Sequence, residues 1–146
     1  MILAALLIGL VFGVLLLAVV SSGAQTAKSN SRPGKPSVRL NTKTVQNRWS
    51  IVQTMTTQGG NGLRQAIMEA DKLLDYVLQG RGYRGDTMAE RMRSANRQFS
   101  RRNEVWAAHK LRNALAHEVG FDLVPSQVKQ SIKAYERAIK DLDGGL

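Results

Sequence analysis

The sequence of 146 residues contains no cysteine. Disulfide bonds, a thiolate nucleophile and cysteine-ligated zinc or iron–sulfur sites are therefore excluded. The chain also has neither a G-x-S-x-G motif nor a Walker-type phosphate loop. The two histidines, His109 and His117, are separated by about 12 Å along a straight helix, which is too far for one metal ion. We therefore expect no metal and no other cofactor.

Acidic residues are missing from the N-terminal part of the chain. The chain carries 21 Lys and Arg against 11 Asp and Glu, for a net charge of +10. All eleven acids lie from Glu69 onward, where fourteen basic residues nearly balance them, whereas residues 21–68 hold seven basic residues and no acid. Most of the net charge therefore lies beside the apolar N-terminus, so the total is weak support for a nucleic-acid partner.

The first twenty residues are apolar apart from two glycines and carry no charged side chain. A helix of this length, at about 1.5 Å per residue, matches a hydrocarbon core of about 30 Å. Because the neighbouring basic residues all follow the segment, the positive-inside rule places the rest of the chain in the cytoplasm. We predict that residues 1–21 form an uncleaved transmembrane helix in the inner or plasma membrane. The alternatives are a secretory signal cleaved near residues 22–24 and a peripheral segment.

Residues 22–43 are rich in small polar residues and include two prolines and two glycines. This composition predicts a flexible linker. Its basic residues suit contact with anionic headgroups, at about 1 kcal/mol each near the surface. The alternative is a solubilising linker whose basic residues only satisfy the positive-inside rule and bind no headgroup.

Residues 44–144 show apolar residues at steps of three and four in five successive blocks, with no strand-like alternation. This spacing is typical of amphipathic helices that share one core. Thr87 and Glu90 fit a capping box, and Pro125 suits the first turn of the last helix. We therefore predict an all-α fold, with an antiparallel bundle of four or five helices behind the transmembrane helix.

Residues 80–85 read Gly-Arg-Gly-Tyr-Arg-Gly and fit the dinucleotide pattern G-x-G-x-x-G. That pattern needs a preceding strand, whereas here a long amphipathic helix precedes it. We predict a glycine-rich turn between helices. The alternative is a phosphate site in which Arg81 and Arg84 lie close to the N-terminus of the next helix.

Basic residues are concentrated between Arg81 and Arg112, where nine of them accompany three acids. Arginine makes bidentate contacts with phosphate, so an RNA or DNA backbone is a plausible partner. Aromatic residues make up only 5 % of the chain, which argues against a base-stacking surface. The alternative is a solvated face of the bundle. The candidate nucleic-acid-binding residues are Arg81, Arg84, Arg91, Arg97, Arg101, Arg102 and Lys110.

The segment around Arg112, Asn113 and His117 combines the residue types that metal-free phosphodiester cleavage needs. A histidine can take or give a proton, and an arginine can neutralise charge on the phosphorane. Asn113 and His117 share a helical face. Arg112 and His117 diverge by about 140°, so they converge only near a helix end or across an interface with a second copy. The alternative is that these side chains only hold the helix end in place.

The stretch Leu-Arg-Asn-Ala-Leu-Ala-His, residues 111–117, resembles the hallmark R-x(4–6)-H of the HEPN domain, in which Asn often follows the Arg. With the turn and the last amphipathic helix, the resemblance covers about residues 103–142. It implies a helical bundle, and in many HEPN proteins a metal-independent ribonuclease that acts as a dimer, with paired motifs lining a cleft between the subunits. Other HEPN proteins are non-catalytic binding modules. The chain departs from the soluble toxin pattern in its apolar N-terminus and in lacking a neighbouring nucleotidyltransferase domain.

The sequence thus leads to the hypothesis of a membrane-anchored, HEPN-like homodimer that binds RNA. In its catalytic form His117 is the acid or base, Arg112 stabilises the phosphate charge, and Asn113 orients His117 or the phosphate. One alternative is a non-catalytic, membrane-tethered interaction or scaffold module in which the R-x4-H segment is structural. Another is a basic domain held on anionic lipid.

Overall fold

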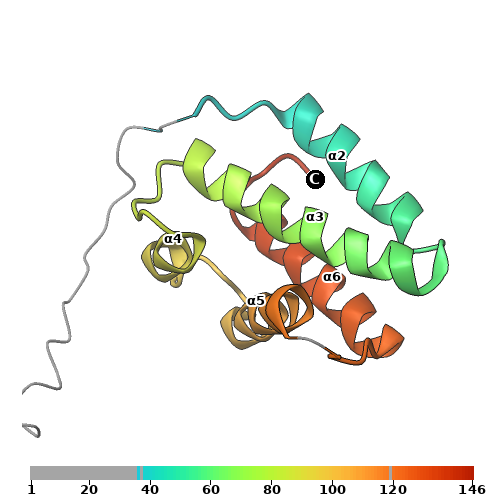
Figure 1. Ribbon diagram of the computed structural model, residues 1–146. Helices are drawn as coiled ribbons and strands as arrows, with labels where there is room; N and C mark the ends of the chain where they lie inside the picture. Colours follow the sequence, from blue (N-terminus) through green and yellow to red (C-terminus); the bar gives the residue numbers. More distant parts are fainter. Residues whose placement is uncertain (1–35, 37, 119) are drawn as a thin grey trace, which may run out of the picture. The chain divides into compact units, whose positions relative to one another are not determined.

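The computed structural model describes residues 36, 38–118 and 120–146 of the chain (Figure 1). These residues form five α-helices and no strand, so the predicted all-α class is confirmed for this part. The helices are α2 (Thr42–Met55), α3 (Gly59–Gly80), α4 (Met88–Ala95), α5 (Arg102–His117) and α6 (Pro125–Asp141). The predicted bundle, residues 44–144, therefore starts two residues late, since α2 begins inside the predicted linker.

The long helix α3 is the centre of the bundle and packs against each of the other four helices. Its apolar residues recur at steps of three and four, so they line one stripe along the helix. Leu63, Ile67, Leu74 and Val77 in this stripe are fully or almost fully buried. Matching stripes of α2, α5 and α6 complete a single core cluster. The apolar residues that recur at helical spacing in the sequence are thus the residues that are buried in the core.

The directions of the helices differ in part from the predicted antiparallel arrangement. α2 and α3 form an antiparallel hairpin, whereas α3 and α6 run side by side in the same direction (Figure 1). At their C-terminal ends, Arg81 donates a hydrogen bond to the carbonyl of Asp143. At their N-terminal ends, Leu63 and Pro125 line one groove. The chain does not alternate up and down between them, because α4 and α5 are seen nearly end-on in Figure 1 whereas α3 and α6 lie across the view.

Helix starts follow the local signals in the sequence. Asn41 caps α2, since its side chain accepts a hydrogen bond from the Thr44 amide. The capping box of Thr87 and Glu90 is present at α4, and Pro125 occupies the first turn of α6, as predicted. The capping box and the proline thus mark where α4 and α6 begin, and so set the length of the connections around α5.

The glycine-rich segment 80–85 is a turn between helices, as predicted. α3 ends at Gly80, where a Cβ atom would lie only 2.8 Å from the Leu40 Cβ. Gly82 has a φ of 79°, a conformation that favours glycine. An α-helix rather than a strand precedes the turn, so the dinucleotide-binding context is missing.

The predicted transmembrane helix, residues 1–21, and most of the predicted linker, up to residue 35, lie outside the described residues. Within the described ranges, none of the helices combines the length and the apolar character that crossing a bilayer requires.

Candidate functional site

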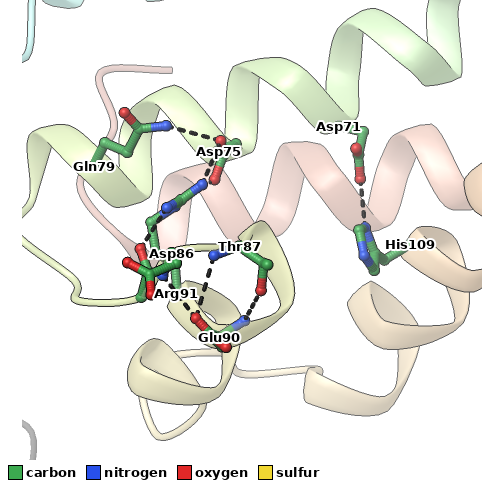
Figure 2. A network of polar contacts seen from close by, with 9 residues as sticks. Asp71, Asp75, Gln79, Asp86, Thr87, Glu90, Arg91 and His109 are labelled. Carbon is green, nitrogen blue, oxygen red and sulfur yellow. Dashed lines mark hydrogen bonds and ion pairs between the residues drawn. The ribbon is translucent and has the colours of Figure 1, made fainter.

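A buried carboxylate on α3 lies at the centre of the candidate site. The Asp71 side chain is only 4 % exposed, although it stands among the apolar residues of α3. Its Oδ1 atom accepts a hydrogen bond from the Tyr135 hydroxyl of α6 at 2.8 Å and lies 2.8 Å from the His109 Nδ1 of α5. Figure 2 shows the contact between Asp71 and His109. Its Oδ2 atom lies 3.0 Å from the Arg112 Nε. Side chains from α5 and α6 thus meet on one carboxylate of α3.

Arg112, the first residue of the R-x4-H motif, is held by this carboxylate. Its Nε is buried and close to Asp71, but its N–H is not aimed at the oxygen well enough for a hydrogen bond. We therefore treat the contact as an ion pair. The Arg112 Nη1 donates a hydrogen bond to the Asn113 Oδ1 at 2.9 Å. The guanidinium is thus directed along α5 toward Asn113, and its side chain stays 23 % exposed.

His109 is the second α5 side chain on the same carboxylate, and the sequence patterns assign it no functional role. Its side chain is 12 % exposed. The Trp106 ring packs edge-on against it, with ring centroids 6.4 Å apart, and Trp106 itself donates a hydrogen bond to Asn96. Asp71 and Trp106 therefore fix the position of the His109 ring, and Tyr135 holds the Asp71 oxygen that His109 contacts.

The signal for Asp71 was present in the sequence, because an acid interrupts an apolar stripe. It lies four residues after Ile67 and three before Leu74, both fully buried. A carboxylate at such a position needs partners, since a buried charge is unstable without them. No local pattern, however, identifies His109, Arg112 and Tyr135 as those partners.

Burial raises the pKa of the Tyr135 hydroxyl well above its usual value of 10, and the negative charge and the hydrogen bond of Asp71 raise it further. The nearby Arg112 opposes this shift. Tyr135 therefore stays protonated at neutral pH and remains a hydrogen-bond donor to Asp71.

His117 occupies a different environment at the end of α5. It is the last residue of the helix and is exposed. Within the described residues it makes no hydrogen bond or ion pair, so no polar interaction joins it to Arg112. Arg64 of α3 donates a hydrogen bond to the Leu115 carbonyl at 2.5 Å, which stabilises the end of the helix next to His117.

The predicted nucleic-acid-binding residues fall into two groups. Three of them contact other parts of the chain: Arg81 binds the Asp143 carbonyl, Arg91 binds Asp75 at 2.7 Å, and Arg101 pairs with Glu104 at 3.1 Å. The others are exposed and form no ion pair with a described residue. These residues are Arg84, Arg97, Arg102 and Lys110, and Arg93 of α4, which the sequence-based set omitted, shares their environment.

At the start of α4, where the predicted alternative places a phosphate, a side chain of the protein itself binds the backbone amides. The Glu90 Oε2 accepts hydrogen bonds from the backbone amides of Asp86 at 2.7 Å and Thr87 at 3.2 Å (Figure 2). These backbone hydrogen bonds lower the pKa of Glu90. The ionised Glu90 therefore occupies the amides that a phosphate would need.

A groove of about 570 Å³ lies between α5 and α6, on a part of α5 separate from the Asp71 contacts. Ala107, Leu111 and Ala134 contribute its apolar wall, and Glu104 and Arg137 lie at its charged end. Among the described residues, no cluster of three or more His, Asp and Glu side chains could hold a metal ion.

Comparisons of the chain with protein-family models, with curated proteins and with solved structures find no match. The functional interpretation therefore depends on the side chains described above and on the residue pattern of the R-x4-H motif.

The environment of Tyr135 predicts how stability changes at alkaline pH. Above pH 10 the unfolded chain loses the Tyr135 proton while the folded chain keeps it, so the free energy of unfolding should fall by about 1.4 kcal/mol per pH unit from this group. The contribution is complete below pH 10 and disappears as the pH rises through the folded-state pKa. Urea unfolding of Tyr135→Phe between pH 10 and 11.5 should show a slope shallower by this amount.

Tyr76→Phe is the matched control, because the hydrogen bonds that the Tyr76 hydroxyl makes with described residues involve backbone atoms of Arg39 and Asn41 and no carboxylate. It should keep the steep slope of the unmodified protein. Equal slopes for Tyr135→Phe and the unmodified protein would show that Tyr135 is not buried against Asp71.

Proposed function

We propose that this chain is a membrane-anchored, HEPN-like protein whose helical domain binds the RNA backbone along α5 and cleaves it without a metal. The observation that carries the proposal is a line of side chains on one face of this helix. Arg102, Trp106, Lys110, Asn113 and His117 follow at steps of four, four, three and four, so they lie within about 80° of one another. Arg102, Lys110 and His117 are exposed.

The positive charge of this face suits a phosphate backbone better than a protein partner that binds through apolar contacts. Arg102 and Lys110 form no ion pair with a described residue, and the exposed Arg93 and Arg97 lie in or just after the preceding helix, α4. Basic side chains of this kind release counterions when they bind a phosphate backbone, and this release supplies most of the sequence-independent affinity. The scarcity of aromatic residues favours backbone contacts over base stacking.

The cleavage site in this proposal is the motif at the end of the same face. Arg112 is directed toward Asn113 by a hydrogen bond, and Asn113 lies one helical turn from His117. This direction of the Arg112 side chain reduces the angle of about 140° around the helix axis that the spacing of Arg112 and His117 implies. In the proposed reaction Arg112 neutralises charge on the phosphorane, His117 transfers a proton, and Asn113 orients the phosphate.

RNA binding is tested with the full chain in detergent micelles and a fluorescently labelled single-stranded RNA, followed by anisotropy between 50 and 300 mM salt. Replacing Arg97, Arg102 and Lys110 together by Gln should weaken binding and lower the slope of log K against log salt by about 2, at about 0.7 per lost phosphate contact. The control is Lys129→Gln, an exposed lysine of α6 that forms no ion pair with described residues. Equal affinity and slope for the triple variant would rule out this face as the RNA site.

A second candidate function is a membrane-tethered interaction or scaffold module. The observation that favours it is the contact of Arg112 with the buried Asp71, which gives the motif arginine a structural role. The α5–α6 groove offers such a module an apolar contact surface. The same binding experiment separates the two functions, because a scaffold module predicts no salt-dependent RNA binding by the unmodified protein.

The membrane anchor is part of the proposal and is supported by the uncharged residues 1–21 and by the seven basic residues that follow before residue 69. With the chain produced in bacterial cells, protease should digest the helical domain in inverted membrane vesicles and leave it intact in spheroplasts. Digestion in spheroplasts would place the domain outside and would contradict a cytoplasmic RNA-binding role.

A further inference from the structure

The two histidines of α5 differ in how they are held. His117 is exposed and makes no polar contact with a described residue, whereas the His109 Nδ1 lies 2.8 Å from the buried Asp71. A carboxylate in this position accepts the Nδ1–H and so selects the tautomer that has its lone pair on Nε2. The His109 Nε2 makes no hydrogen bond to a described residue. His109 therefore has the arrangement of a general base that is oriented by a carboxylate.

The groups around this pair hold the carboxylate and the imidazole in place. Tyr135 of α6 donates a hydrogen bond to the same oxygen, and Arg112 of α5 lies against the other oxygen. Trp106 packs on the ring, and its own N–H is bound by Asn96, which follows α4. Among the described contacts of Asp71 and His109, Arg112 thus supplies the positive charge.

The position of His109 along α5 adds a geometric argument. His109, Asn113 and His117 are spaced i, i+4 and i+8, so one histidine stands a helical turn, or about 6 Å, on either side of Asn113. A phosphate bound at Asn113 and Arg112 would have a histidine on each side. In-line displacement at phosphorus needs this arrangement, because the attacking and leaving oxygens lie on opposite sides of the phosphorus.

We propose that His109, positioned by Asp71, is the general base of the RNA cleavage proposed above. The inference rests on that proposed function. The His109 Nε2 takes the proton of a ribose 2′-hydroxyl, and the 2′-oxygen forms a bond to the adjacent phosphorus. The bond from phosphorus to the 5′-oxygen breaks, and His117 in its protonated form gives its proton to that oxygen. The products are a 2′,3′-cyclic phosphate and a 5′-hydroxyl end, with atoms and charges balanced.

The test compares the full-length unmodified protein with His109→Gln and His109→Ala, using an end-labelled single-stranded RNA. We expect His109→Gln to cleave at least 100-fold more slowly, within the usual range for loss of a general base, while its RNA affinity stays within twofold. The rising limb of kcat/KM against pH should disappear in this variant. Added imidazole should restore part of the activity of His109→Ala, which a purely structural role does not predict.

Each other outcome contradicts one part of the account. Cleavage by His109→Gln within threefold of the unmodified protein would overturn the role of His109, and so would an unmodified pH profile without a rising limb, even if the variants fail to fold. RNA binding without any cleavage by the unmodified protein would overturn this inference and leave the binding function standing. Absence of RNA binding would overturn the proposed function itself. Lys129→Gln serves as the control for both measurements, because Lys129 is exposed and lines a groove with Trp49 of α2 and Leu63 of α3.

Discussion

The organisation of this domain depends on the burial of one carboxylate. Asp71 lies in the apolar stripe of the central helix and is almost inaccessible to solvent. A charge in this position is stable only if other groups replace the water it loses, and those groups must come from helices that pack against α3. Tyr135 of α6 and both His109 and Arg112 of α5 supply these contacts. The carboxylate therefore joins three helices through groups that hydrophobic packing alone would not select.

The same interaction links the fold to the proposed chemistry. Apolar residues alone allow α5 some freedom to rotate and slide, but the ion pair and the His109 contact fix its rotation and its register against α3. As a result, the neighbouring face of α5, with Arg102 and Lys110, is presented to solvent. The residues that connect α5 to the core and those that would meet RNA thus lie on neighbouring faces of one helix, with Arg112 and Asn113 between them.

Much of the fold could be predicted because the relevant signals are local. The steps of three and four identify the helices, Thr87 and Pro125 mark two of their starts, and the glycines at 80–85 mark a turn. The parallel direction of α3 and α6 was missed, because it depends on how the chain passes through α4 and α5. The motif residues Arg112, Asn113 and His117 were identified from their residue types and spacing, and their role stays a prediction. The contacts of Asp71 join residues up to 64 positions apart, which no window of sequence reveals. The membrane segment and the RNA function remain predictions.

The coupling between Asp71 and Arg112 tests the central claim most directly. A double-mutant cycle with Asp71→Asn and Arg112→Met, measured by urea unfolding, isolates the energy of this pair from the cost of each substitution. Because the carboxylate is buried, we expect a coupling energy of about 1.5 to 3 kcal/mol, whereas the exposed pair Glu69 and Lys72 should give less than about 1 kcal/mol in the same experiment. Additivity of the Asp71 and Arg112 substitutions within about 0.5 kcal/mol would contradict the account, since Asp71 would then not hold Arg112 in place.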